Sequence, residues 1–367
     1  MNKRKIWLIV LAIIIIAGII VGIRLTQKPA PKEQVIKIGA ILPLTGRAAD
    51  MGQEMKRGIE LAEAYWNTIR KNKKFNLSVT FEDSQSSPQG GINALRSLIA
   101  RNYRLFIIPL SVVAMSVRPI IQQNNVIAFL DASHPEITKP AYRYIFRHSQ
   151  NAEWEAQQIM KDIMKSKHIK NIYVFYLNDE YGKSFVEALK SSFGTRLSLF
   201  LNPYETESIN FRNLIQKSRV LSSPESESVV ITVGVGKPMG LLIKTLREQG
   251  YRGKIYAAMG YIATGARNVL SESERKNIFY TDLTWKESPA LRWMLQKYQE
   301  KFGKDAPGVA QLEFQTVILI ASAVEEAKTG DLQEIADRIR KLAPEIIGGT
   351  ITEFNDIFPI LLIREEK

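Results

Sequence analysis

The sequence predicts an α/β protein made of two doubly wound α/β lobes that follow an N-terminal transmembrane helix. Two observations predict the lobes. Short apolar runs rich in β-branched residues alternate with amphipathic helical patterns, and this alternation starts afresh near residue 151. A third observation, an uncharged apolar stretch near the N-terminus, predicts the transmembrane helix. The 367 residues, 45% of them hydrophobic, are enough for two domains with separate cores.

The membrane helix is expected over residues 6–23, which carry no charge and approach the roughly 20 residues that span a bilayer. Lys3, Arg4 and Lys5 precede it, which favours a cytoplasmic N-terminus and an extracytoplasmic globular part. The apolar run exceeds the core of a secretory signal, and no small-x-small site follows it. We therefore expect an uncleaved signal-anchor, with cleavage as the alternative, and residues 1–34 form the cytoplasmic stub, anchor and linker.

The first half of the globular part contains four predicted strands that alternate with three predicted helices. The strands are expected over 35–42, 76–84, 105–111 and 126–132, and the helices over 51–71, 88–102 and 116–125. A loop over 133–142 follows. Strands that are apolar on both faces and are each followed by a helix indicate a parallel sheet covered by helices.

The second half repeats this pattern, which indicates a second lobe. Helices are expected over 151–167, 180–193, 210–220 and 239–250, and strands over 171–177, 196–202, 228–234 and 254–260. The last third adds helices over 288–303 and 309–330, followed by strand-like runs over 348–354 and 358–366.

The composition excludes several functional classes. The chain has no cysteine, so disulfides, thiolate metal sites, a cysteine nucleophile and a lipidated N-terminal cysteine are all excluded. The net charge is +13, and residues 1–34 contribute five of these positive charges. The remaining positive charge is consistent with a solvated lysine-rich surface. No basic helix with interleaved aromatic residues is present, so we expect no nucleic-acid partner.

The sequence patterns do not match the common catalytic motifs. His134, His148 and His168 lack metal-ligand spacing and a carboxylate–His–Ser arrangement. The run "VGVGKPMG" (233–240) has neither the glycine spacing of a dinucleotide fingerprint nor that of a phosphate loop. The acidic pair Asp179-Glu180 is expected to be a solvated turn and helix cap. The sequence therefore predicts neither an enzyme nor a metal or cofactor.

Several strand-to-helix corners are rich in Thr, Ser, Gly and aromatic residues. The first is "IGAILPLTGRAADMGQ" (38–53), which contains the Thr45-Gly46 turn. Ligands of open α/β sheets lie outside the carboxyl ends of the strands, so these corners are expected to converge on a cleft between the lobes.

These corners carry a family resemblance. "VIKIGAILPLTGRAADMGQEMKRGIELA" resembles the opening of the leucine/isoleucine/valine-type periplasmic binding proteins. "EDSQSSPQGGINALRSLI", "NIYVFYLNDEYGKSFVEALK" and "GGTITEFND" resemble later segments of that family in the same order. The similarity covers nearly everything after residue 35.

The resemblance implies a type I periplasmic binding protein fold, with three interlobe crossings near residues 146–148, 280–283 and 347–352, and hinge closure over a ligand. It places residues 35–147 with 283–347 in the N-terminal lobe, and residues 148–282 with 348–367 in the C-terminal lobe. The implied function is a solute receptor that passes a small molecule to the permease of an ATP-driven importer. A ligand-sensing module is the runner-up, and an extracytoplasmic enzyme comes third.

The resemblance and the corners together place twelve residues at the ligand. They are Thr45, Gly46, Met51, Ser111, Val112, Asp131, Ala132, Ser133, Tyr181, Val235, Gly260 and Tyr261.

The family binds the ammonium of an amino acid with an acidic residue of the second lobe. That position corresponds to Gly260-Tyr261, where no acid is present, and Val112-Val113 make the opposite wall more apolar. We therefore expect weak or absent binding of free leucine, isoleucine and valine, and a preference for a less charged or more apolar solute. In the alternative, Asp131 of the first lobe supplies the missing carboxylate.

Overall fold

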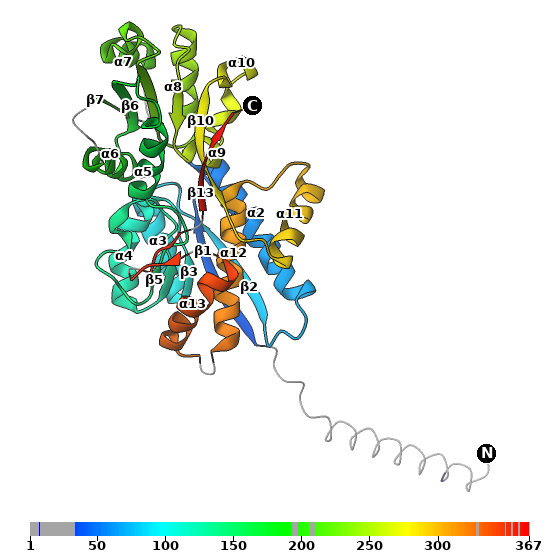
Figure 1. Ribbon diagram of the computed structural model, residues 1–367. Helices are drawn as coiled ribbons and strands as arrows, with labels where there is room; N and C mark the ends of the chain where they lie inside the picture. Colours follow the sequence, from blue (N-terminus) through cyan, green and yellow to red (C-terminus); the bar gives the residue numbers. More distant parts are fainter. Residues whose placement is uncertain are drawn as a thin grey trace.

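The structure is a computed structural model that describes Trp7 and residues 34–366, except 193–196, 206–209, 328–329, 349, 354 and 359. The predicted membrane helix over 6–23 lies outside the described residues, apart from Trp7. Among the described residues, no helix is long and apolar enough to cross a membrane. The described chain forms two α/β lobes, one above the other in Figure 1, which confirms the predicted bilobed architecture.

The first lobe is built on a five-stranded parallel sheet in the order β2-β1-β3-β4-β5. The last five residues of its inner strand β1 are all buried, as expected for a parallel sheet covered on both faces. The strands are β1 (Val35–Leu42), β2 (Asn76–Asp83), β3 (Leu105–Ile107), β4 (Ile127–Phe129) and β5 (Ile145–Phe146).

Helices from both ends of the chain cover this sheet. The long helix α12 packs against α2, and the two lie side by side in Figure 1. A Cβ on Gly58 of α2 would lie 2.1 Å from the carbonyl oxygen of Ala310, so only glycine allows this approach. The helices are α2 (Ala49–Ala64), the π-turn η1 (Tyr65–Ile69), α3 (Pro88–Ala100), α4 (Ser111–Asn124), the 3₁₀ turn η2 (Pro135–Ile137), α11 (Pro289–Phe302), α12 (Gly308–Glu326) and α13 (Leu332–Ile346).

The second lobe is built on a six-stranded sheet in the order β13-β10-β9-β8-β6-β7. Neighbouring strands are parallel except at the C-terminal strand β13, which pairs antiparallel with β10. The strands are β6 (Asn171–Leu177), β7 (Ser198–Tyr204), β8 (Ser228–Val233), β9 (Ile255–Ala257), β10 (Ile278–Thr284) and β13 (Ile360–Glu365).

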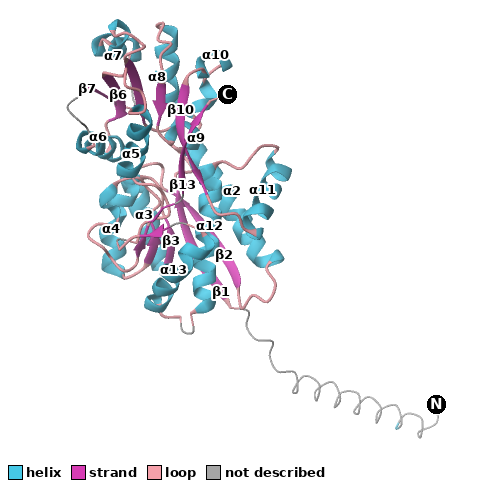
Figure 2. Cartoon of the chain, viewed as in Figure 1, coloured by secondary structure: helices cyan, strands magenta, loops and turns pink. Residues whose placement is uncertain are grey.

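Figure 2 shows helices around the strands of both lobes. The helical segments of the second lobe are α5 (Ala152–Ile163), α6 (Glu180–Ser191), α7 (Phe211–Ser218), η3 (Val220–Ser222), α8 (Gly236–Glu248), α9 (Gly260–Ala263), η4 (Ala266–Val269) and α10 (Glu272–Arg275). Late in the sequence, β11 (Thr350–Ile351) and β12 (Ile357–Phe358) form a small antiparallel pair of their own.

The structure differs from the sequence predictions at several places, and it contains the strand β5 and the helix α13, which the sequence patterns do not predict. The segment around 280–283, where a crossing between the lobes is expected, forms the end of β10, a strand that the sequence patterns do not predict because its burial is mixed. The crossing itself stays a prediction. The helix expected from residue 116 begins at Ser111, because Pro109 has no N–H to continue the sheet after β3. The single run expected over 358–366 is divided between β12 and β13. The lobe boundaries remain predictions.

Candidate functional site

A cavity of about 60 Å³, counted as the space open to the centres of water-sized probes, lies between the two lobes. Its walls include residues that follow parallel strands: Asp131 and Ala132 follow β4, Asp179 follows β6, Val235 follows β8, and Met259 follows β9. This edge of an α/β sheet is the usual position of a ligand. The cavity is therefore the candidate binding site.

The cavity brings together nine of the twelve residues selected from the sequence. These nine are Met51, Ser111, Val112, Asp131, Ala132, Ser133, Tyr181, Val235 and Gly260.

The other three residues lie outside the cavity lining. Thr45 donates its hydroxyl to Oδ2 of Asp83 over 2.6 Å, and its N–H to Oδ1 over 3.2 Å. Gly46 has a φ of +85°, and a Cβ there would lie 2.9 Å from the carbonyl oxygen of Gln85. Tyr261 is fully buried in the second-lobe core. Thr45 and Gly46 therefore shape the corner that carries the next residue, Arg47, whose side chain belongs to the cavity wall.

The first-lobe wall is formed in part by the N-terminus of α4. Leu110 precedes this helix with a φ of +78°, and Ser111 is its first residue. The Ser111 hydroxyl accepts a hydrogen bond from the N–H of His134 over 3.1 Å, which ties the helix start to the loop after β4. Val112 and Met51 make the same wall largely apolar. This wall therefore combines helix-terminal polar groups with an apolar surface.

An ion pair crosses the cavity from one lobe to the other. Nη2 of Arg47 lies 2.8 Å from Oδ2 of Asp179, and both side chains are at most 20% exposed. Oδ1 of Asp179 accepts a hydrogen bond from the N–H of Gly182 over 3.0 Å and so caps α6. The cap agrees with the sequence prediction, but Asp179 is not a solvated surface acid. The lobes are thus closed over the cavity.

Two buried carboxyl groups lie on the first-lobe side of the cavity: Asp131 belongs to its wall, and Glu313 lies behind that wall. Oδ1 of Asp131 accepts a hydrogen bond from the N–H of His148 over 2.6 Å. Oδ2 of Asp131 and both carboxyl oxygens of Glu313 have no hydrogen-bond partner among the described residues. Burial raises the pKa of Asp131 to about 7, and burial together with the Asp131 charge raises the pKa of Glu313 well above its usual value.

A third buried carboxyl group lies behind the second-lobe wall, and its oxygens are occupied. Glu155 on α5 accepts hydrogen bonds from the N–H of Met259 over 2.7 Å and from the Tyr181 hydroxyl over 2.8 Å. The Thr281 hydroxyl is its third donor. Burial raises the pKa of Glu155, and the three donors oppose that shift. Glu155 therefore fixes the positions of Tyr181 and Met259 in the cavity wall.

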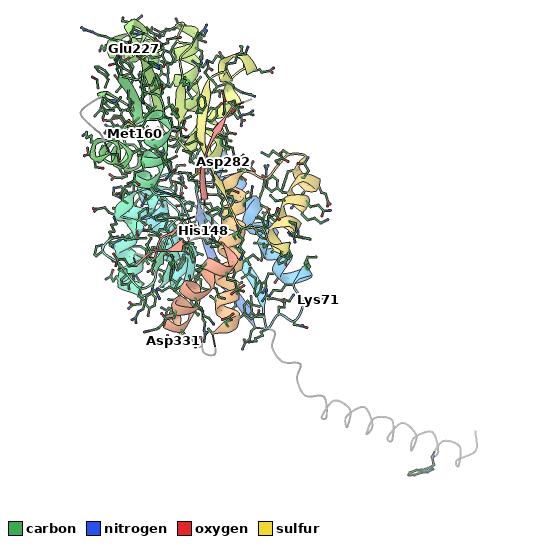
Figure 3. All side chains as sticks on the ribbon, viewed as in Figure 1. Lys71, His148, Met160, Glu227, Asp282 and Asp331 are labelled. Carbon is green, nitrogen blue, oxygen red and sulfur yellow. The ribbon has the colours of Figure 1, made fainter. Side chains whose placement is uncertain are left out.

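His148 is buried at the start of the segment that is predicted to enter the second lobe (Figure 3). Nε1 of Trp285 can only donate, so Nε2 of His148 accepts over 3.2 Å. Nδ1 then carries the proton and donates to the Thr316 hydroxyl over 2.9 Å. Burial lowers the pKa of His148 to about 3, so the ring is neutral and structural.

Comparison with known proteins identifies the family. A family model described as periplasmic binding protein matches residues 35–355. The chain belongs to the periplasmic binding protein family. The resemblance to leucine/isoleucine/valine-type binding proteins seen in the sequence is thereby confirmed. A curated relative, Leu/Ile/Val-binding protein homolog 3 of Brucella melitensis, is 24% identical over 324 residues, which is 86% of each chain.

Two solved structures share the fold of this periplasmic binding protein. A leucine binding protein, LivK, from Thermotoga maritima has a TM-score of 0.78 at 19% identity, with 90% of this chain and 95% of that one covered. The branched-chain amino acid transporter substrate binding protein LivJ from Streptococcus pneumoniae, in complex with isoleucine, also has a TM-score of 0.78. Its identity is 16%, and the match covers 91% and 96% of the two chains.

Sequence reasoning missed several residues of this binding protein. Arg47 could have been selected from the sequence, because it directly follows the Thr45-Gly46 turn, at the corner that is predicted to face the cleft. No local sequence pattern points to Glu155 or Glu313, since they reach the site from helices that are distant in sequence. Among the described residues, no group of three or more His, Asp or Glu side chains could hold a metal ion.

Proposed function

We propose that this periplasmic binding protein is a solute receptor that captures a small organic molecule outside the cytoplasm and passes it to the permease of an ABC importer. The observation that carries the proposal is the interlobe cavity, whose walls come from both lobes and which the Arg47–Asp179 ion pair crosses. A site built from two lobes can open and close by a hinge, which lets a receptor bind a solute and later release it. The name of the LivJ relative, a transporter substrate binding protein, supports the same assignment.

We further propose that an N-terminal helix over 6–23 anchors the receptor in the cell membrane as a single span, with the globular part extracytoplasmic. The uncharged apolar run and the preceding basic residues support this anchor. The lobes are assigned as residues 35–147 with 283–347, and residues 148–282 with 348–367. The nine cavity residues selected from the sequence are assigned to ligand contact.

The chemistry of the cavity suits binding without turnover. The Arg47 and Asp179 side chains neutralise each other, and Oδ1 of Asp179 is already occupied as a helix cap. His148 is neutral and holds two side-chain partners away from the cavity. We expect a panel of hydrolase substrates to show no turnover. Reproducible turnover that is abolished by Asp179→Ala or Glu180→Ala would favour an enzyme instead.

A thermal-shift screen of the full-length chain in detergent tests the receptor assignment. The panel consists of amino acids, amides, short peptides and short carboxylic acids, and we expect a subset to raise the unfolding temperature in a concentration-dependent way. A Val235→Trp variant, which fills the cavity, should lose that shift. Leu241→Ala, an exposed position on α8, is the matched control and should keep it. Transport is then tested as loss of uptake of the identified solute in cells that lack the protein.

A further inference from the structure

A group of basic side chains gathers at the base of the first lobe, the end that points away from the second lobe (Figure 1). The N–H of Asn76 donates to the carbonyl of Gln34 over 2.9 Å, which joins the turn before β2 to the start of β1. Figure 3 shows Lys71 at this end of the molecule and Glu227 at the opposite end. We call the group the basal patch, and it consists of Lys37 on β1, Lys71, Lys73 and Lys74 in the turn between η1 and β2, and Arg104 ahead of β3.

The basal patch keeps its positive charge, because none of its members forms an ion pair with an acid among the described residues. Lys73, Lys74 and Arg104 donate to backbone carbonyls. Lys37 lies over an aromatic ring, with 5.8 Å between its Nζ and the ring centre. The carboxylate of Glu325, beside the turn, is already paired with Arg70, which is not a member of the patch. The patch therefore presents uncompensated cations to its surroundings.

Two exposed apolar side chains accompany these cations. Val35 begins β1 and is 48% exposed, and Ile69 ends η1 and is 45% exposed. Lysines can reach lipid phosphates while neighbouring apolar side chains enter the boundary between headgroups and acyl chains. The composition of this face is therefore consistent with a lipid surface.

The chain enters the first lobe at the same face. Residues 24–33 separate the expected anchor from Gln34, and a chain of this length reaches at most about 35 Å. This segment carries Arg24, Lys28 and Lys32 against a single acid. An anchored protein therefore keeps the basal patch near the lipid surface, at a high effective concentration.

We propose that the first lobe docks on the membrane through the basal patch, with its basic side chains on the phosphate groups of anionic lipids. This docking rests on the proposed membrane anchor and adds the surface that orients the anchored receptor. Each basic side chain near an anionic surface contributes a modest attraction, which salt screens. The patch is too small to hold the protein on a membrane alone, so it orients a lobe that the anchor already keeps nearby. Docking through the first lobe leaves the second lobe free for hinge motion.

Energy transfer to a labelled lipid tests this orientation on the full-length chain in vesicles. The chain has no cysteine, so a single introduced cysteine takes the donor dye. Thr68→Cys places the dye at an exposed position beside the basal patch, and Ser226→Cys places it at an exposed position next to Glu227, at the opposite end. The acceptor is a headgroup-labelled lipid in vesicles of phosphatidylcholine, with or without phosphatidylglycerol.

We expect stronger transfer from position 68 when phosphatidylglycerol is present. The increase should disappear when the salt is raised from about 0.1 M to about 1 M, because the screening length falls from about 10 Å to about 3 Å. Transfer from position 226 should be weak with both lipid compositions.

The decisive variant combines Lys71→Gln, Lys73→Gln and Lys74→Gln, which removes three charges and keeps side chains that can donate to carbonyls. Each lysine at an anionic surface changes the ratio of docked to undocked protein about fivefold, so this ratio should fall about 100-fold. Transfer from position 68 should then drop to its level in phosphatidylcholine alone.

The matched control removes three lysines at the opposite end of the molecule, by Lys165→Gln, Lys167→Gln and Lys170→Gln. Two of these lysines are paired there, with Asp162 and Glu227, each over 2.7 Å. The control lowers the net charge by the same amount and should leave the transfer from position 68 unchanged. A thermal melt of each variant verifies folding.

Two results would overturn the docking and leave the anchor in place. The first is equal transfer from position 68 in the two lipid compositions, and the second is transfer that the three glutamine substitutions do not change. Either result would favour a protein partner, such as the permease, at this face. If the full-length chain does not float with vesicles of either composition, the anchor and the docking fail together. The receptor assignment is judged separately, by solute binding.

Discussion

Arg47 of the first lobe and Asp179 of the second lobe form an ion pair across the cavity, with 2.8 Å between Nη2 and Oδ2. The two residues are 132 positions apart in the chain, and each follows a strand of its own sheet. A second contact, 3.4 Å between Nε2 of His134 and Oε2 of Glu180, also connects the two lobes. Because both contacts require the lobes to be close together, they stabilise the closed form relative to an open one.

Replacement of Arg47 with Ala should shift the protein toward the open form. A partly buried ion pair of this kind contributes about 1 kcal/mol, so we expect roughly a 5-fold loss of affinity for the solute found by thermal shift. Small-angle X-ray scattering should show a larger radius of gyration for the solute-free variant. Arg212→Ala removes an exposed ion pair with Glu248 within the second lobe and should leave both quantities unchanged. Equal affinities of Arg47→Ala and wild type would show that closure does not depend on this pair.

Replacement of Gly58 with Ala should destabilise the first lobe, although alanine is the better helix former by about 1 kcal/mol. The added Cβ would lie 2.1 Å from the carbonyl oxygen of Ala310, so α2 and α12 must separate. We expect a net loss of about 1–3 kcal/mol of unfolding free energy in denaturant titrations. Glu60→Ala, two residues further on the same helix, leaves the α2–α12 contact in place and should change stability by less than about 0.5 kcal/mol. A Gly58→Ala variant as stable as wild type would show that the two helices can move apart freely.

The bilobed fold could be predicted from the sequence because its strands are continuous apolar runs, and its helices show a clear polar face. β10 was missed for the opposite reason, since Thr281 and Asp282 interrupt the apolar pattern. Its pairing on both sides, with β9 and β13, is a long-range property that a local pattern does not contain.

The cavity was predicted less completely than the fold. Positions directly after strands, such as Asp131, Tyr181 and Val235, could be selected because the topology places them at one edge. Thr45 and Tyr261 were selected by the same rule but face Asp83 and the second-lobe core instead, because side-chain direction depends on the turn. The sequence has no acid near Gly260, and weak binding of free leucine, isoleucine and valine stays a prediction.

The membrane anchor remains a prediction from residues 6–23. Protein extracted from membranes should retain residue 1 or 2 in its intact mass, because no small-x-small site follows the apolar run. It should also stay in the membrane fraction after an alkaline carbonate wash, and deletion of residues 1–23 should release it. A mature N-terminus near residue 30, or release of the intact chain by the wash, would contradict the anchor.

The buried carboxyl group of Asp131 should make the solute-free protein less stable as the pH rises. Its pKa in the folded state is about 7, above the ordinary 3.8, because burial disfavours the charged form. Between these two values the folded protein holds a proton that the unfolded chain releases, so stability falls as the pH rises from about 4 through 7. Asp131→Asn removes this group, and the variant should gain on the order of 2–4 kcal/mol relative to wild type between pH 5 and pH 8.

Denaturant titrations at half-unit pH steps measure this difference directly. Taking the difference between variant and wild type cancels groups that titrate independently of Asp131, such as His148, whose pKa of about 3 gives a pH dependence of opposite sign below pH 6.5. Glu313 does not cancel, because the Asp131 charge raises its pKa, and it adds to the difference. Asp162→Asn is the control, because the pKa of Asp162 is lowered by hydrogen bonds to Lys165 and Tyr256 that outweigh its partial burial. Its difference from wild type should therefore be flat between pH 5 and pH 8. A flat curve for Asp131→Asn as well would show that Asp131 is ionised throughout that range and that its burial is compensated by charges around it.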